Sequence, residues 1–308
     1  MSIFGQLFGK KENAIGKKPP SRGEDVNIDY KSIFQELSRN AIKLSFDTSS
    51  IAPVTVGASK FGGQPDLPNG FAWPYYAYID SNNIEQSKPL SFLLQINCME
   101  ITGYDADRLL PKAGMLYFFY DLETMTWGFD PKDKGSARVY YYDIDSFTRQ
   151  SFPPELALEY RMPEMPVSFT TKNDLPDYEE FAENYQMDMH DFEVYNEQLE
   201  KFGYVQEERN RSKLLGYADI IQNDMLMECE SVTNGTYYGG IPVKLREDQR
   251  KTFLENCKQW KLLMQMDTVY SDNFELMFGD CGHIYYYIKE RDLADLNFDN
   301  CWLILQCY

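Results

Sequence analysis

The stretch FLLQIN at positions 92–97 decides the fold, because it sets one glutamine, Gln95, inside an otherwise apolar run. Downstream of it, the aromatic run MLYFFY begins directly after Gly114. Closer to the C-terminus, LLMQMD carries Gln265, and HIYYYI begins directly after Gly282. Short aromatic and β-branched runs bounded by turn residues are typical of strands. The shared order of the two parts therefore predicts an internal duplication of a strand pair.

The spacing of the two parts agrees with a duplication. Gly114 follows Gln95 by 19 residues, and Gly282 follows Gln265 by 17. A third apolar run, LILQC, places Gln306 in a similar setting. Chance resemblance is the alternative, because strands draw on few residue types. We expect an α+β fold that is mainly β, with antiparallel strands in two pseudo-repeated halves and a few flanking helices.

The segments around these strands have patterns of their own. Apolar residues recur every three or four positions from Tyr30 to Leu44, which predicts one amphipathic helix. A second helix is expected from Arg246 to Trp260. Residues 54–74 are dense in glycine and proline, so we expect a rigid, ordered loop there. The runs PLSFLLQIN, GMLYFFYD and ARVYYYDI, which begin at residues 89, 114 and 137, predict an antiparallel meander.

The chain is expected to form one domain, residues 25–308, behind a leader of residues 1–24. The leader combines a short apolar patch with basic residues and a Pro-Pro pair, which indicates a mobile basic tail. Within the domain we place the first half at 51–150 and the second half at 213–308. Residues 151–212 begin with prolines and continue with acids and aromatics at near-helical spacing, so an acidic helical connector is expected. We interpret its acids as a solvated helix face rather than a docking surface.

The charge balance bears on the class of partner. The chain has 30 Lys and Arg against 48 Asp and Glu, a net charge of −18. An acidic surface repels nucleic-acid phosphates and anionic lipid head groups, so we expect no nucleic-acid partner. The same charge favours a basic protein partner, although an acidic surface that serves solubility alone is the simpler explanation.

The cysteines and the lack of targeting signals bear on the compartment. The six cysteines show neither C-x-x-C spacing nor the density of a disulfide scaffold, so we expect reduced thiols. No run approaches the ~18 apolar residues of a membrane span, and the N-terminus does not have the charged start and apolar core of a secretory signal. We expect a cytoplasmic protein without a membrane span.

Three glutamines, Gln95, Gln265 and Gln306, are the most informative polar residues. A carboxamide within an apolar strand costs about 1–3 kcal/mol unless its donors and acceptor are paired. Two explanations stay open. The glutamines either bond backbone groups or one another and so join the halves, or they line a pocket between the halves together with Gln222 and Asp280.

The loop rich in glycine and proline is a second candidate binding element. Gly62 and Gly63 allow close backbone approach, and Pro65 stiffens the path to Trp73. The loop either presents Trp73 to a partner or inserts it into the core. Asp280, within FGDCG, either caps a turn or contributes to a site.

The common catalytic motifs are absent from the sequence. His190 and His283 are its two histidines, which excludes a multi-histidine metal site. A pair formed by Cys281 and His283 has no third group in sequence to orient the base. We therefore expect no catalytic residues, no metal and no cofactor, and favour a protein that is not an enzyme.

Several motifs, taken together and in order, resemble the bacterial YwqG-like family, a domain of unknown function. They are SKFGGQPDLPNGFAWP from residue 59, LPKAGMLYFFYD from 110, LLGYADIIQNDM from 214 and MFGDCGHIYYYI from 277. The resemblance implies a mainly β fold with flanking helices, a bacterial cytoplasmic setting and no established catalytic residues. The chain departs from the family at Ala218, where the family has proline, at Phe278, where it has tryptophan, and at Val269, where it has aspartate. A ligand that used this last acid would not bind here in the same way.

These patterns favour a non-catalytic protein-binding module, of which a toxin-neutralising immunity protein is one form. The alternative is a small-molecule binder or hydrolase with a pocket between the two halves. The candidate binding residues are Gly62, Gly63, Pro65, Trp73, Gln95, Gln222, Gln265, Asp280 and Gln306.

Overall fold

The computed structural model describes residues 29–50, 52–144, 146–185, 191–204, 210–236 and 246–308. The expected leader, residues 1–24, and His190 lie outside the described residues. Within the described part of the chain, none of the helices combines the length and the apolar character that are needed to cross a bilayer.

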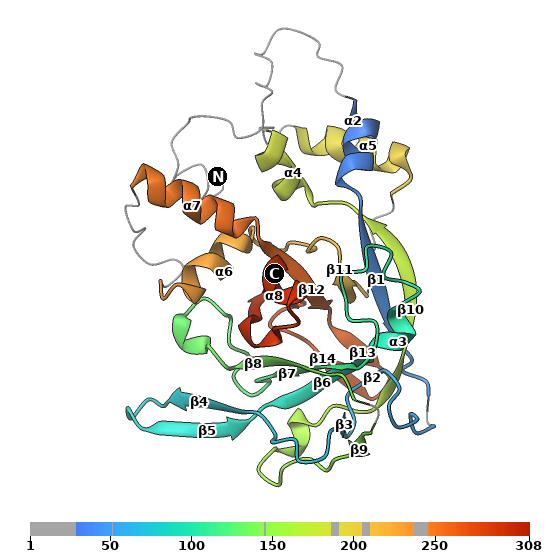
Figure 1. Cartoon of the computed structure of the whole chain (residues 1–308), viewed down its shortest axis with the longest axis vertical. Coiled ribbons are helices and arrows are strands. Elements are labelled where there is room, and N and C mark those ends of the chain that lie inside the picture. The colour runs from blue at the N-terminus through green and yellow to red at the C-terminus, as the bar shows by residue number, and fades with distance from the viewer. Residues whose placement is uncertain (1–28, 51, 145, 186–190, 205–209, 237–245) are drawn as a thin grey trace.

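One large antiparallel sheet forms the body of the molecule (Figure 1). In spatial order its ten strands are β16 (Trp302–Gln306), β15 (His283–Lys289), β12 (Trp260–Met266), β11 (Lys213–Leu215), β1 (Arg39–Phe46), β10 (Met165–Asp174), β2 (Lys60–Phe61), β6 (Ser91–Asn97), β7 (Met115–Tyr120) and β8 (Ala137–Tyr142). The expected meander is confirmed as β6, β7 and β8.

Three two-stranded pairs accompany the large sheet. They are β3 (Asp66–Leu67) with β9 (Thr148–Arg149), β4 (Tyr75–Ile79) with β5 (Glu85–Pro89), and β13 (Val269–Ser271) with β14 (Phe274–Leu276). The hairpin of β4 and β5 extends beyond the main sheet at the lower left of Figure 1.

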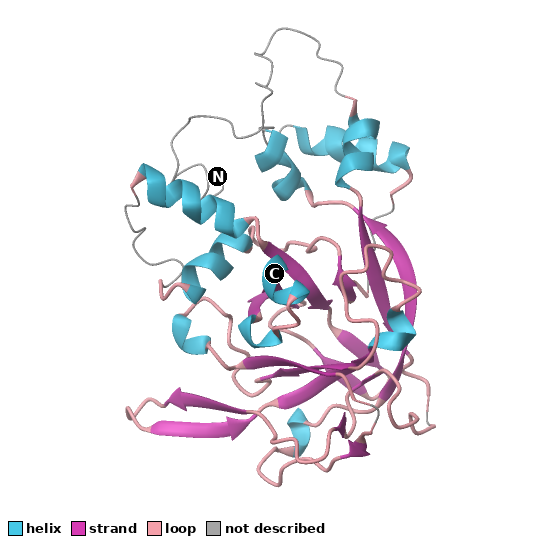
Figure 2. Ribbon diagram, viewed as in Figure 1, coloured by secondary structure: helices cyan, strands magenta, loops and turns pink. Residues whose placement is uncertain are grey.

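Helices are short and lie around the sheet (Figure 2). They are α2 (Tyr30–Leu37), α3 (Cys98–Ile101), α4 (Tyr178–Tyr185), α5 (Phe192–Phe202), α6 (Leu226–Thr233), α7 (Glu247–Cys257) and α8 (Glu290–Ala294), with 3-10 turns at Pro131–Asp133, Leu158–Tyr160 and Phe298–Asn300. The helix expected near residues 246–260 is confirmed as α7. Helices α2, α4 and α5 share a separate aromatic cluster at one end of the molecule.

The helix predicted from Tyr30 to Leu44 is wrong in its second part, because α2 ends at Leu37 and β1 follows. Ala41, Ile42 and Leu44 are buried in β1, which lies between β10 and β11 in the middle of the sheet. A central strand is buried on both faces, so its apolar residues need not alternate and can imitate a helical period.

The connector predicted at residues 151–212 contains the expected helices α4 and α5 but also an element that was not expected. After the prolines the chain enters β10, which pairs with β1 along its whole length from Arg39 opposite Asp174 to Phe46 opposite Val167. The segment between the two predicted halves therefore supplies a central strand of the sheet.

Residues from both ends of the sheet share one hydrophobic core. It includes Leu94 and Phe118 from the first half and Met264 and Tyr286 from the second. The rings of Phe118 and Tyr286 meet edge to face at 5.3 Å, and the Tyr286 hydroxyl donates to the Phe119 carbonyl oxygen at 2.9 Å. Packing between β7 and β15 thus brings the two ends of the sheet close together.

The last strand, β16, is covered along its outer edge by the loop that follows β7. The Leu305 amide donates to the Trp127 carbonyl oxygen at 3.1 Å, and Trp302 Nε1 donates to the Gly128 carbonyl oxygen at 2.9 Å. Gly128 has a φ of 78°, and a Cβ there would collide with the Leu303 carbonyl oxygen. The sheet is therefore nearly closed where its two ends meet.

Candidate functional site

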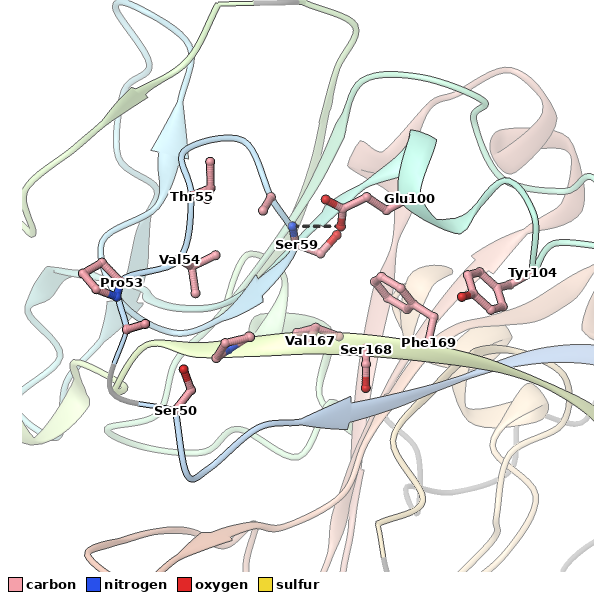
Figure 3. Close-up of a pocket in the computed structure, with 13 residues that line it drawn as sticks. Ser50, Pro53, Val54, Thr55, Ser59, Glu100, Tyr104, Val167, Ser168 and Phe169 are labelled. Atoms are coloured by element: carbon pink, nitrogen blue, oxygen red, sulfur yellow. Dashed lines mark hydrogen bonds between the residues drawn. The ribbon is translucent and has the colours of Figure 1, made fainter.

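An open groove with a volume of about 540 Å³ lies beside β10 (Figure 3). Its lining comes from the loop at residues 50–59, from Glu100 and Tyr104, and from residues 166–169 of β10. We call it the β10 groove. Its volume is within the range of about 300–1,000 Å³ that is usual for ligand pockets.

The groove lies along a strand edge that has little pairing. On one side β10 pairs with β1 from Val167 to Asp174, whereas on the other side it pairs with β2 at Met165 and Pro166 alone among the described residues. The Asp47 amide bonds the Pro166 carbonyl oxygen, so the backbone groups of residue 166 point toward β1. Because these directions alternate, the N–H and C=O groups of Phe169 and Thr171 point away from β1. Figure 3 shows the groove on this second side of β10.

The side chains of the groove are mainly apolar or hydroxylic. The ring of Phe169 lies 5.9 Å from that of Tyr104, and Pro53 and Val54 form the opposite wall. Glu100 is the charged residue of the lining, and its Oε2 accepts a hydrogen bond of 3.1 Å from the Ser59 amide. An apolar segment that carries a basic group matches this lining.

A cluster of charged residues holds the wall of the groove. The Val54 amide donates to Glu164 Oε1 at 2.8 Å, and Arg149 donates to the Val54 carbonyl oxygen at 2.8 Å. Lys60 is fully buried and bonds Glu164 Oε2 at 2.7 Å. Arg149 also pairs with Asp66 Oδ1 at 2.8 Å. Val54 is thus fixed through both of its backbone polar groups.

The electrostatics of this cluster are those of paired charges. Burial lowers the pKa of Lys60 from its usual value, against the opposing effect of Glu164 and Asp66. Burial alone would raise the pKa of Asp66, but hydrogen bonds from Arg149 and Gln95 outweigh it and hold that pKa below its usual value. Lys60 and Arg149 thus lie in contact with Asp66 and Glu164, and pairing of this kind is the usual condition for buried charged residues.

Gln95 belongs to the same cluster, and it bonds Ala58, which lines the groove. Its Oε1 accepts from the Asp66 amide at 2.9 Å, and its Nε2 donates to the Ala58 carbonyl oxygen at 2.7 Å and to Asp66 Oδ2 at 2.9 Å. The Tyr117 hydroxyl donates to the Asp66 carbonyl oxygen at 2.6 Å. Every side-chain polar atom of Gln95 has a partner, so it does not face a cavity.

Gln265 has the same kind of surroundings in the second half. Its Oε1 accepts from the Asp219 amide at 2.9 Å, and its Nε2 donates to the Arg211 carbonyl oxygen and to Asp219 Oδ2. The Tyr285 hydroxyl donates to the Asp219 carbonyl oxygen at 2.6 Å. Lys213 lies 2.8 Å from Asp219 Oδ2, as Lys60 lies near Asp66 in the first cluster.

These two lysine–aspartate clusters were missed in the sequence, although a signal for them is present. The chain reads SKFGGQPD from Ser59 and SKLLGYAD from Ser212, with Ser, Lys, Gly and Asp at the same four positions of each run. The two serines also act alike, since Ser59 Oγ accepts from the Asn97 amide and Ser212 Oγ accepts from the Asp267 amide. An alignment of loops rather than of strands would have found them.

The second cluster differs from the first in holding additional acids. Lys213 also bonds Asp174 Oδ2 at 2.8 Å, and Asp177 accepts from the Ile220 amide. Removal of its carboxyl from water raises the pKa of Asp177 to about 7, and the neighbouring Asp219 carboxylate adds to this effect. Asp177 directly precedes α4, so this acid connects the cluster to the helices.

Of the residues predicted in the glycine- and proline-rich loop, Gly62, Gly63 and Pro65 adjoin the first cluster in sequence, whereas Trp73 packs elsewhere. Gly62 and Gly63 have φ values of 57° and 67°, and a Cβ on either would collide with residues 162–164. Pro65 is buried beside Asp66. Trp73 packs edge to face on Phe119 at 5.4 Å and donates to the Leu90 carbonyl oxygen at 2.9 Å. In this arrangement the Trp73 ring packs toward the core.

Two other predicted residues, Gln306 and Gln222, are brought together at the end of β16. Gln306 Oε1 accepts from the Ile221 and Gln222 amides at 3.1 Å each, and Gln222 Nε2 donates to the Cys307 carbonyl oxygen at 2.7 Å. Asp280 lies in an exposed turn, and its carbonyl oxygen accepts from the Tyr308 amide. The nine predicted residues therefore occupy separate places in the fold, and neither described cavity is lined by any of them.

The surroundings of His283 add an acid that the sequence did not reveal. His283 is buried, and its Nδ1 lies 3.1 Å from Asp267 Oδ1. The Cys281 thiol is exposed and lies 3.9 Å from Met277 Sδ. All six cysteines are free thiols. In the described ranges, no group of three or more histidine, cysteine and acidic side chains is placed to hold a metal ion.

A second cavity of about 330 Å³ lies between α6 and α7 beside Glu230. The Glu230 carboxylate is buried and accepts from Asn256 at 2.9 Å and from Trp260 Nε1 at 3.0 Å. Lys289 pairs with it at 2.8 Å. These bonds serve helix packing, which leaves the β10 groove as the better candidate site.

Comparison with known proteins gives one family. The model of a domain of unknown function, DUF1963, matches residues 59–307, which include both lysine–aspartate clusters and the whole of β10. No curated protein matches the chain.

Proposed function

The chain belongs to the DUF1963 family, a domain of unknown function, and we propose that it is a non-catalytic protein-binding module that adds an extended segment of a partner along β10. Strand addition needs an accessible row of backbone donors and acceptors, with pockets nearby for alternate side chains. The β10 groove offers both features.

One observation carries the proposal, namely the unequal pairing of the two sides of β10. A strand in the middle of a sheet normally forms hydrogen bonds with a neighbouring strand along both edges. In β10, the edge that faces away from β1 has no partner strand from Val167 onward among the described residues. Glu164 and Arg149 bond the backbone N–H and C=O groups of Val54. They therefore hold the groove wall that faces β10 away from the unpaired edge of this strand. A groove that is already formed limits the entropy lost when a segment binds.

The charge of the molecule supports a basic partner. Glu100 is the charged residue of the groove lining, and the whole chain has a net charge of −18. Opposite charge accelerates encounter and selects among partners more than it adds affinity. A toxin-neutralising immunity protein would be one instance of such a module.

The test compares Phe169→Pro with Phe169→Val in the full chain. Both variants shorten the side chain beside Tyr104, but proline alone removes the N–H group that points into the groove. The tagged wild type and both variants are purified from the organism that encodes the chain, and bound proteins are identified by mass spectrometry. We expect a stoichiometric basic protein with the wild type and with Phe169→Val, and its loss with Phe169→Pro.

Hydrogen exchange then locates the contact. Partner binding is expected to slow exchange of the Phe169 and Thr171 amides, which point away from β1. Recovery of no stoichiometric basic protein, or equal recovery with all three chains, would contradict the proposal.

A small-molecule site in the same groove is the second candidate function, and the volume of about 540 Å³ favours it. Small molecules do not need the backbone N–H of Phe169. A compound that raises the melting temperature of the wild type and of Phe169→Pro alike would therefore support this candidate over strand addition.

We also infer that the two halves are repeats of YwqG-like type. This inference is supported by the paired runs from Ser59 and Ser212, by the matching bonds of Gln95 and Gln265, and by a strand order that is symmetric about β1 and β10. The chain's motifs support a cytoplasmic setting in the same way, as an expectation from resemblance.

A further inference from the structure

The hairpin of β4 and β5 presents an apolar stripe to solvent on one of its faces. Successive residues of a strand point to opposite faces, which places Tyr75, Ala77 and Ile79 on one face and Tyr76 and Tyr78 on the other. The first three are exposed, and Ile79 has 59% of its surface accessible. Ile84, in the turn at the tip, is 54% accessible.

The other face of the hairpin attaches it to the body. Lys88 is buried and lies 3.0 Å from Asp121 Oδ1, and its ammonium group is 4.9 Å from the centre of the Tyr78 ring. The Tyr76 hydroxyl donates to the Lys132 carbonyl oxygen at 3.2 Å. A two-stranded hairpin is marginally stable by itself, so these contacts are what keeps it in place.

The tip of the hairpin is ordered by its own side chains. Asp80 Oδ1 accepts from the Asn82 and Ile84 amides at 2.9 Å each, and Asn83 takes a positive φ of 61°. The exposed stripe therefore has one conformation before any partner binds. A preorganised surface of this kind loses little conformational entropy on association.

Acids surround the stripe. Glu85 pairs across the hairpin with Ile79, Asp80 follows Ile79, and Glu155 lies 3.4 Å from the Tyr75 hydroxyl. Lys88, the basic residue of the two strands, lies on the attached face and is paired. Ala77 and Ile79 are exposed, and ordered exposed apolar residues are typical of interaction sites.

We propose that the β4–β5 hairpin is a second docking surface, which takes a protein partner with apolar residues flanked by lysine or arginine. The acids disfavour a second copy of this chain as the partner, because like charges on the two copies repel one another. The hairpin and the β10 groove have no residues in common, so this inference does not rest on the function proposed for the groove.

The probe for the test is a synthetic peptide of 12 residues that alternates lysine with valine, with a glutamate–valine peptide as its counterpart. Amide resonances of the ¹⁵N-labelled full chain are followed during titration. We expect the lysine peptide to shift the amides of Ile79, Ile84 and Glu85, and the glutamate peptide to leave them unchanged. Added salt should weaken the effect, because the contact is exposed.

Two variants test the residues that we assign. Ile79→Ser removes the centre of the stripe, and Glu85→Lys reverses the charge opposite it. Each is expected to weaken binding of the lysine peptide at the hairpin about tenfold, as loss of an anchor does at protein interfaces. Asp272→Lys is the matched control, because it reverses an exposed acid in the turn of another hairpin, β13–β14, and should leave the affinity unchanged.

The outcomes distinguish binding at the hairpin from binding at the β10 groove. Shifts that occur at residues 167–171 without any at residues 75–89 would overturn the docking role of the hairpin and leave the groove proposal intact. An equal loss of affinity in Asp272→Lys would also overturn it, since net charge alone would then explain binding. Hairpin shifts that persist in Phe169→Pro support the hairpin independently of the groove.

Discussion

Gln95 and Gln265 each make three side-chain bonds from a strand to a distant segment, Gln95 to residues 58 and 66 and Gln265 to residues 211 and 219. The sequence shows that these carboxamides are buried, because each lies within an apolar run. It does not show their partners, because Asp66 and Asp219 belong to segments far away along the chain. Of the two explanations that stayed open, bonding to backbone groups fits the observed contacts of both residues, but these bonds do not join residues 51–150 to residues 213–308.

Gln95→Met is expected to lower the free energy of unfolding by about 2–4 kcal/mol. Methionine keeps the volume but leaves the Asp66 amide and the Ala58 carbonyl oxygen buried without a partner. Gln222→Met is the control, since Gln222 is exposed and should cost less than about 1 kcal/mol. Urea denaturation measures both changes, and a similar small loss in both would contradict the role given to Gln95.

Comparing Gly62→Ala with Gly70→Ala distinguishes two causes of lost stability, namely backbone strain and steric collision of the new Cβ. Both glycines have a positive φ, but an alanine Cβ at residue 62 would collide with the Pro163 carbonyl oxygen, whereas residue 70 faces open space. We expect a cost of about 1 kcal/mol for Gly70→Ala from strain alone, and about 2–3 kcal/mol more for Gly62→Ala. Thermal unfolding checks this order, and equal losses would show that the close approach at Gly62 is relieved easily.

At the scale of elements, the sequence predicts edge and meander strands better than central ones. The strands β6, β7 and β8 were found because turn residues bound each of them. In contrast, the sequence pattern predicts a helix across most of β1 and a connector where β10 lies. Both lie in the middle of the sheet, where pairing with strands from distant parts of the chain decides the structure and local periodicity does not. The groove depends on β10 and was therefore not predicted.

The junction between β10 and α4 gives a prediction for pH. Because the pKa of Asp177 is raised to about 7 in the folded chain, the folded state favours its neutral form, and stability falls as pH rises from about 4 through 7. Asp177→Asn should remove this part of the slope. At pH 8 we expect it to be more stable than the wild type by about 1–2 kcal/mol, after allowance for partial exposure.

Denaturant melts at pH 5 and pH 8 measure the slope. The exposed Asp272→Asn serves as the reference and should retain the slope of the wild type. A parallel pH dependence in all three chains would show that Asp177 is charged in the folded state at both pH values.

At the scale of the whole molecule, the shared core makes residues 51–150 and residues 213–308 depend on each other for stability. Composition and charge indicate a large core but do not show that β7 packs against β15. Tyr286→Phe tests this seam, because it removes the hydroxyl that bonds the Phe119 carbonyl oxygen. We expect a loss of about 1–2 kcal/mol in one cooperative transition, compared with about zero for Tyr270→Phe, whose ring is 53% exposed. Fluorescence and circular dichroism should report the same midpoint, and two separate transitions would contradict a shared core.

The contacts of Trp127 and Gly128 with β16 also affect the tendency of the protein to aggregate at high concentration. An uncovered terminal strand is a template on which chains can stack into insoluble aggregates. Here the strand is occupied by a loop from the opposite end of the sheet, and the only residue type that fits under the Leu303 carbonyl is glycine. A single methyl group at position 128 would therefore displace this cover and expose the edge of β16, which lowers the solubility of the chain.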